Sequence, residues 1–160
     1  MSKNSGVPPP WVHRCAASLL LVLGCCSQLP PTSSVVISPV PAGAARIWIY
    51  RNEGPYESHD RPYFRLNNQV AGISEPDGVL YRDVPPGRYV VSVDSYGVPY
   101  PIQFADFDIR AGQEAFIKVL SMRVKVGDDG IASRAIFFTQ LVAADAARAA
   151  IASTPFYGGG

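Results

Sequence analysis

The chain has 160 residues, of which 48% are hydrophobic, and it contains 15 prolines and 14 glycines. Domains commonly run to ~100–200 residues, so this length is typical of one domain, and the proline and glycine content favours many turns over long helices. The formal net charge is +1. Removal of residues 1–24 would take away two of the 14 basic residues and leave 12 against 13 acidic ones. This balance excludes binding of nucleic acid or anionic lipid through a strongly basic field.

The cysteines are confined to the N-terminal region, at Cys15, Cys25 and Cys26. The remaining 134 positions therefore offer no thiol. This distribution excludes an internal disulfide framework in the expected domain, and it also excludes a cysteine-based zinc site there.

The first residues have the pattern of a secretory signal. Lys3, His13 and Arg14 precede an apolar run over residues 15–24. A weakly basic start followed by ~7–15 apolar residues is typical of a signal peptide. The run is too short for a membrane-spanning helix, which needs ~20 residues. We therefore expect residues 1–24 to be a cleaved signal peptide.

The apolar run ends in Leu23-Gly24-Cys25, which resembles a bacterial lipobox, where a small residue precedes the cysteine that becomes lipidated. The resemblance implies acyl chains on Cys25 that hold the protein at a membrane, each buried CH₂ contributing ~0.8 kcal/mol. The next residue is Cys26 rather than aspartate, which by resemblance to Gram-negative lipoproteins implies the outer membrane and a periplasm-facing protein. The alternative is an ordinary signal peptide that yields a secreted or periplasmic protein.

Residues 25–44 are expected to be the lipidated N-terminus and a tether. This stretch is rich in proline, serine and threonine, a composition typical of an extended linker. The folded domain is then expected over residues 45–141, and residues 142–160 are expected to form an alanine-rich helical segment and a flexible tail.

Residues 45–141 alternate apolar and polar side chains as β-strands do. In residues 83–94, a Pro85-Pro86-Gly87 turn leads into a run where Tyr89 and Val91 share one face with Val93. An earlier strand places Ile47 and Ile49 on one face and Trp48 and Tyr50 on the other. Further strands are expected at residues 63–66, 69–73, 79–84, 102–109, 114–126 and 131–141.

Turn residues separate these runs. Asn67-Asn68 suits a tight hairpin because asparagine tolerates positive φ, and residues 75–78 and 127–130 are further turns. The apolar phase slips near Ala105-Asp106, which predicts a bulge. The spacing predicts an all-β fold: a single antiparallel β-sandwich of about seven or eight strands with a short C-terminal helix.

The C-terminal residues change character. Residues 142–153 are rich in alanine, a good helix former, and Ala144, Ala147 and Ile151 make a narrow apolar stripe. Asp145 and Arg148 are three residues apart, which predicts a weak stabilising pair. Residues 156–160 are expected to be loose.

Three features together resemble a family of small bacterial envelope lipoproteins with a domain of unknown function. They are the lipobox at Gly24-Cys25, the strand at residues 45–51, and the Pro85-Pro86-Gly87-Arg88-Tyr89 turn before a valine-rich strand. The turn is also common in carboxypeptidase-regulatory-like and other prealbumin-like sandwiches. Over residues 44–141 the resemblance implies a β-sandwich and an envelope location, and it supplies no catalytic residues.

Residues that could carry chemistry are few. His59 lies beside Asp60 and near Glu57, but a metal site needs several convergent ligands, so a solvated loop histidine is the favoured interpretation. A serine–histidine–aspartate relay lacks a nucleophile motif. Asp128 and Asp129 are explained by a hairpin turn rather than by calcium. We therefore expect no catalytic residue, no metal and no cofactor.

Tyrosines on expected loops are the remaining candidates for a binding site, and several arginines are expected at the surface. Tyr56, Tyr96 and Tyr100 fall on expected loops, where exposed aromatics favour recognition of a ligand or partner. The alternative is that tyrosines cap the core with their hydroxyls in water. The arginines at expected strand ends, assigned to solvent, are Arg46, Arg51, Arg61, Arg65 and Arg82.

The sequence favours a non-enzymatic, membrane-anchored envelope lipoprotein that acts as an interaction or scaffolding module for another envelope protein. One alternative is a lipoprotein that binds a small ligand or glycan through the loop tyrosines. Another is a lipoprotein component of a secretion apparatus. The sequence leaves the partner and the oligomeric state open.

Overall fold

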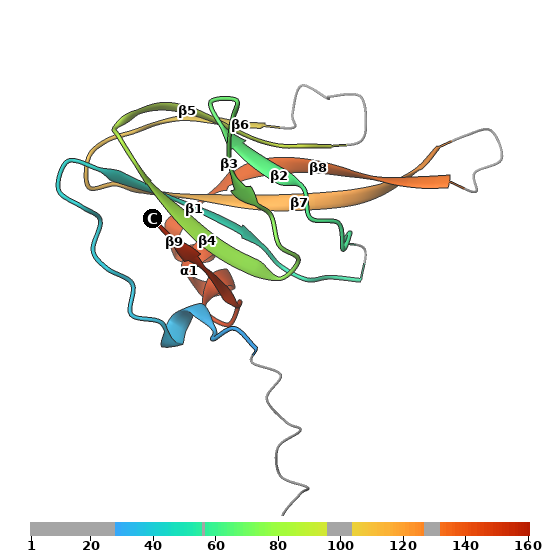
Figure 1. Cartoon of the computed structure of the whole chain (residues 1–160), viewed down its shortest axis with the longest axis horizontal. Coiled ribbons are helices and arrows are strands. Elements are labelled where there is room, and N and C mark those ends of the chain that lie inside the picture. Colours follow the sequence, from blue (N-terminus) through green and yellow to red (C-terminus); the bar gives the residue numbers. More distant parts are fainter. Residues whose placement is uncertain (1–27, 56, 96–103, 127–131) are drawn as a thin grey trace, which may run out of the picture.

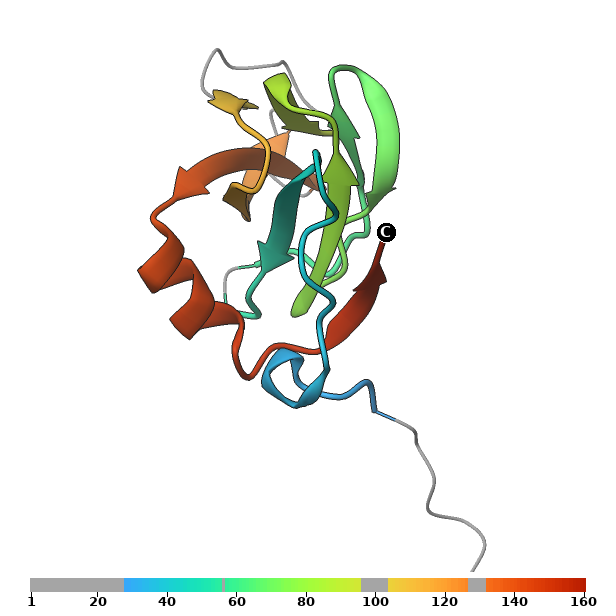
Figure 2. The same cartoon turned by 90° about the vertical axis from the view of Figure 1, so that its left-hand side faces the viewer.

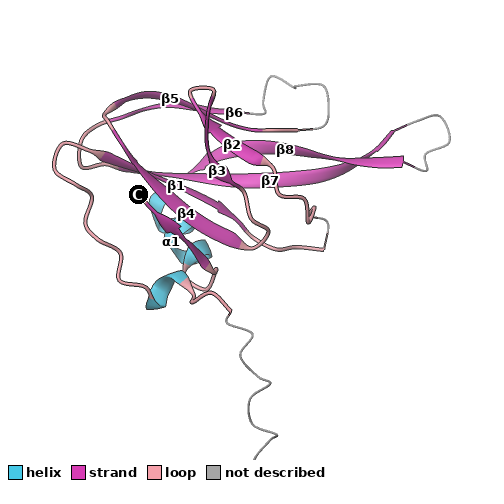
Figure 3. Cartoon of the chain, viewed as in Figure 1, coloured by secondary structure: helices cyan, strands magenta, loops and turns pink. Residues whose placement is uncertain are grey.

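The computed structural model describes residues 28–55, 57–95, 104–126 and 132–160. Within these residues the chain forms nine strands, one α-helix and one short 3₁₀ turn (Figure 3). In chain order they are η2 (Thr32–Ser34), β1 (Ala45–Arg51), β2 (Tyr63–Leu66), β3 (Gln69–Ile73), β4 (Gly78–Val84), β5 (Gly87–Val93), β6 (Phe104–Ile109), β7 (Glu114–Val126), β8 (Ala132–Val142), α1 (Ala144–Ile151) and β9 (Phe156–Gly159).

The strands form two sheets that face each other (Figure 1). The five-stranded sheet has the order β8-β7-β1-β4-β9, and the four-stranded sheet has the order β3-β2-β5-β6. Most neighbours are antiparallel, but β1–β7 and β4–β9 are parallel. The all-β expectation is confirmed. The strand number is nine in the described residues rather than seven or eight, and the two parallel pairs correct the purely antiparallel expectation.

An apolar core fills the space between the sheets. It takes alternate residues from each strand, because successive side chains on a strand point to opposite faces. Phe64, Val91, Ile117 and Phe137 come from four different strands and are fully buried. The predicted face of β1 is confirmed, since Ile47 and Ile49 point into this core.

A second apolar cluster covers the other face of the five-stranded sheet. Trp48 and Tyr50 of β1 lie here with Phe116 of β7, and α1 packs over them through Ala147 and Ile151. Seen from the side, α1 and the N-terminal chain lie on this outer face (Figure 2), and Phe156 of the edge strand β9 packs against the same cluster. The predicted stripe of α1 therefore does face the domain. β1 is buried on both faces along its whole length.

Local turn chemistry is confirmed where the structure describes it. Asn67 and Asn68 have φ of 47° and 67°, so the β2–β3 hairpin uses the left-handed conformation that asparagine tolerates. Asp77 has φ of 47° in the turn before β4. At the β4–β5 turn, the Tyr89 hydroxyl donates to the carbonyl of Pro85 at 2.9 Å. The expected turn at residues 127–130 lies outside the described residues.

The predicted bulge near Ala105-Asp106 is wrong. β6 pairs with β5 in unbroken antiparallel register from Gly87↔Ile109 to Ser92↔Phe104. Ala105 and Ile109 are buried, whereas Phe104 is 47% exposed. The phase seemed to slip because an exposed phenylalanine was assigned to the core face.

The C-terminal tail is ordered rather than loose. Residues 156–159 form β9 and pair in parallel with β4. Gly159 makes this approach possible, because a Cβ at that position would lie 2.1 Å from the ring of Tyr81. The expected Asp145–Arg148 pair is replaced by a contact across the fold: Arg148 pairs with Glu114, which also accepts from Trp48 Nε1 at 2.9 Å.

Single polar side chains join the two sheets at their open sides. The buried Thr139 hydroxyl on β8 donates to Val91 O at 2.7 Å and accepts from Ala105 N at 2.8 Å. On the opposite side, Arg82 of β4 donates through Nε to Ala71 O of β3 at 2.8 Å. These links fix the sheets against each other where no backbone ladder connects them.

The Thr139 link can be tested by removing its hydroxyl. Thr139→Val keeps the shape but leaves two buried backbone groups without their partner, and an unsatisfied buried group costs roughly 1–3 kcal/mol. We expect Thr139→Val to lower the free energy of unfolding, measured by urea denaturation, clearly more than Thr139→Ser. Equal stability of the two variants would contradict the link.

Candidate functional site

The residues singled out as sites from the sequence lie outside the described part of the chain. These are the lipidation candidate Cys25 and the loop residues Tyr56, Tyr96 and Tyr100. Acylation and a tyrosine-lined binding site therefore stay predictions. The described residues instead show how the chain that follows Cys25 meets the domain.

Residues 30–38, expected to be part of a free tether, lie against the domain. Thr32 donates through its backbone N and its hydroxyl to Thr154 O, at 2.9 and 2.8 Å. Phe156 N donates to Pro30 O at 3.0 Å, and Pro31 and Pro155 form an antiparallel bridge. The expectation of a free tether is wrong from Pro30 onward, because the backbone there is hydrogen-bonded to the chain around the start of β9. No local sequence pattern indicates this pairing.

Arg46 fixes the other end of this segment. Its guanidinium donates to both carboxylate oxygens of Asp83 at 2.7 and 2.8 Å and to Ser38 O at 2.7 Å. The guanidinium carbon also lies 3.8 Å from the ring centroid of Tyr81. Hydrogen bonds to Asp83 raise the pKa of Arg46. The expectation that Arg46 points into solvent is wrong, since its side chain is 2% exposed.

Replacement of Arg46 tests this attachment. Arg46→Met would leave the carboxylate of Asp83 without its partner, and breaking a buried ion pair in this way costs roughly 3 kcal/mol. We expect a lower urea midpoint and faster proteolytic cleavage within residues 28–38. Arg61→Met is the control, because Arg61 is 67% exposed in its pair with Glu75. Similar losses for both variants would contradict the role of Arg46.

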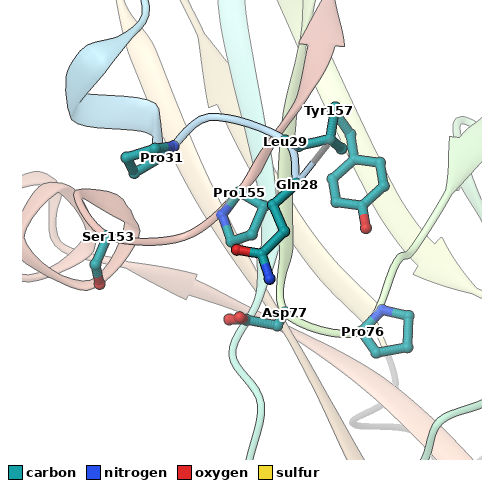
Figure 4. A pocket seen from close by; sticks show the side chains of 8 residues that line it. All are labelled: Gln28, Leu29, Pro31, Pro76, Asp77, Ser153, Pro155 and Tyr157. Carbon is teal, nitrogen blue, oxygen red and sulfur yellow. The ribbon is translucent and has the colours of Figure 1, made fainter. Parts of the chain in front are cut away.

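A groove opens where the N-terminal chain meets β9 (Figure 4). Its volume is about 630 Å³. Leu29 and Tyr157 in its wall are 43% and 42% exposed. Asp77 is the one charged residue among those that line it. The lining residues are Gln28, Leu29, Pro31, Pro76, Asp77, Ser153, Pro155 and Tyr157.

His59 lies in a second pocket, of about 400 Å³, beside Met122 and Arg123 of β7. Glu57 in this pocket accepts hydrogen bonds from Ser121, through its backbone N at 3.0 Å and through its hydroxyl. The Ser121 hydroxyl in turn accepts from Ser58 N at 2.8 Å. Glu57 and Ser121 therefore fasten the loop to β7. Glu57 and Ser121 are 64 residues apart, so no local sequence pattern predicts their pairing.

Arg51 is buried beneath this loop, which corrects its assignment to solvent. Its side chain is 1% exposed, donates to Asp60 O at 2.8 Å and lies 5.0 Å from the ring centroid of Phe137. Its Nε is 3.9 Å from the nearer oxygen of Glu57. Burial lowers the pKa of Arg51, although an arginine stays charged at neutral pH.

The outer face of the four-stranded sheet combines ion pairs with exposed apolar side chains. Arg88 pairs with Asp106 at 2.6 Å and Arg65 with Asp94 at 2.7 Å. The apolar residues are Tyr63, Val70, Ile73 and Phe104, which are 51%, 53%, 38% and 47% exposed. Tyr63 and Ile73 are direct partners on β2 and β3, so their side chains share this face.

The Arg88–Asp106 pair predicts a pH dependence. Hydrogen bonds from Arg88 lower the pKa of the Asp106 carboxyl. The pair therefore stabilises the fold above the ordinary carboxyl pKa of ~3.9, and its contribution disappears as pH falls through the lower folded value. Urea midpoints of wild type and Asp106→Asn should differ at neutral pH and converge in strong acid. Arg88→Gln should behave likewise; a midpoint difference independent of pH would contradict the assignment.

Side chains occupy backbone groups on two edge strands. Ala71 O of β3 accepts a hydrogen bond from Arg82, and Phe137 N of β8 donates to the Ser95 hydroxyl at 3.2 Å. Such contacts blunt an edge against pairing with another strand. A partner is therefore better accommodated by a sheet face or a loop than by strand addition at these edges.

Comparison with protein families, with curated proteins and with solved structures found no match for this chain. Among the described residues, no helix is both long and apolar enough to span a membrane.

Proposed function

We propose that the chain is a non-enzymatic lipoprotein of the bacterial cell envelope, held at the outer membrane by acyl chains on Cys25. The folded part is proposed to be one β-sandwich that faces the periplasm and acts as an interaction or scaffolding module. The observation that carries this proposal is the apolar run of residues 15–24 followed directly by Cys25. Acyl chains at that position would supply stable attachment without a membrane-spanning helix.

The arrangement of the domain supports a scaffolding role. The chain that leads from Cys25 is bound to the domain from Pro30, so the anchor and the folded part would move together. The outer face of the four-stranded sheet offers exposed apolar side chains around fixed ion pairs. Aromatic side chains and arginines, both present on this face, are enriched at protein–protein interfaces. An envelope protein is the proposed partner.

The anchor is tested by Cys25→Ala. We expect the variant to leave the membrane fraction and to lose incorporation of an alkyne-labelled fatty acid, because the acyl acceptor is gone. Cys26→Ala is the matched control and should stay in the membrane fraction with its label. A Cys25→Ala protein that remains in the membrane pellet would rule out the proposal.

A further inference from the structure

The chain between the proposed anchor and the domain is short. Pro30 is already hydrogen-bonded to Phe156 N. Pro30 lies five positions after Cys25, with four residues between them. An extended residue spans ~3.3–3.6 Å, so this stretch reaches at most ~17 Å. If Cys25 is acylated, on which this inference rests, the domain cannot move far from the lipid.

The dimensions of a bilayer set an upper bound on the distance between Pro30 and the lipid headgroups. The hydrocarbon core is ~30 Å thick and the whole bilayer ~40–45 Å, so each headgroup layer is ~5–8 Å deep. An acylated residue sits at the hydrocarbon boundary and uses part of its reach to cross that layer. Pro30 would then stand no more than ~12 Å above the headgroups. The next residue, Pro31, lines the groove, so the groove lies close to this point.

The groove carries side chains suited to a lipid surface. Leu29 and Tyr157 are each more than two-fifths exposed, and both lie at one end of the groove (Figure 4). Tyrosine combines an apolar ring with a hydroxyl and is enriched at membrane interfaces. Asp77 is the one charged lining residue, so the groove attracts a cationic amine rather than a phosphate.

We infer that the groove lined by Gln28, Leu29, Asp77 and Tyr157 rests on the headgroup layer of the anchoring membrane, where Asp77 pairs with the ammonium group of an aminophospholipid. The groove is lined by residues of the N-terminal segment and of the chain before β9. These segments and the four-stranded sheet lie on opposite sides of the five-stranded sheet (Figures 1 and 2). The membrane contact therefore leaves the outer face of the four-stranded sheet directed away from the lipid.

The inference can be tested with a reporter on each side of the domain. The full, naturally processed chain carries Cys26→Ser and one new cysteine, either Ser153→Cys in the groove or Val70→Cys on the four-stranded sheet. Each is labelled with a fluorophore and reconstituted into phosphatidylethanolamine vesicles that contain a headgroup-nitroxide lipid. Urea midpoints close to that of the unlabelled protein confirm that both variants fold.

We expect loss of emission from the label at residue 153 and unchanged emission at residue 70. Insertion of ten Gly/Ser residues between Ser27 and Gln28 adds roughly 17 Å of flexible reach and should weaken the quenching at residue 153. Replacing the ethanolamine lipid by phosphatidylglycerol, or Asp77→Asn, should weaken it too.

Two outcomes would overturn the inference, and they differ. If the protein sediments with the vesicles but both labels are quenched equally, or residue 70 more strongly, the groove does not face the lipid although the anchor is real. If the processed protein carries no acyl group and stays in the supernatant, the proposed function fails together with the inference. Selective quenching that is insensitive to lipid headgroup would leave the groove orientation in place and refute the role of Asp77.

Discussion

The fold depends on one strand that is buried on both faces. β1 places Ala45, Ile47 and Ile49 in the core between the sheets, and it places Trp48 and Tyr50 in the outer cluster. A sheet with only one apolar face can leave its other face in water, but this sheet cannot. Something must cover Trp48 and its neighbours. The chain uses its own two ends for this, with α1 and β9 from one end and residues 30–38 from the other.

Local chemistry predicted the middle of the chain well. Alternating side chains and turn residues located β2, β3 and β7, and the asparagine pair adopts the expected backbone because that preference is a property of the residue itself. The two covering segments could not be recognised in this way. One is rich in proline and the other ends in three glycines, compositions that normally indicate loose chain, and their order comes from hydrogen bonds between residues more than 120 positions apart.

The burial of two arginines could not be predicted from local sequence patterns either. Arg46 and Arg51 read as solvent-facing ends of a strand, because charged residues are rarely buried without partners. Arg46 has such partners in Asp83, Ser38 and Tyr81, which are 37, eight and 35 residues away. No spacing rule on a single strand reveals such a pairing. The sequence did not predict the groove beside β9 either, because its walls come from the N-terminal chain, the turn before β4, and β9 with the chain that precedes it.

The covering of β1 and the proposed anchor are physically connected. A free tether over residues 25–44 would behave as a coil with an end-to-end distance of ~25 Å, and the domain would tumble at the surface in many orientations. Pro30 and Thr32 are hydrogen-bonded to the C-terminal segment, so the chain from Pro30 to Thr32 does not behave as part of a free tether. With Cys25 acylated as proposed, the contacts that bury Trp48 and Tyr81 would also restrict how the domain stands on the membrane. A scaffold that must present one sheet face repeatedly to a partner gains from this restriction, since less orientational entropy is lost on binding.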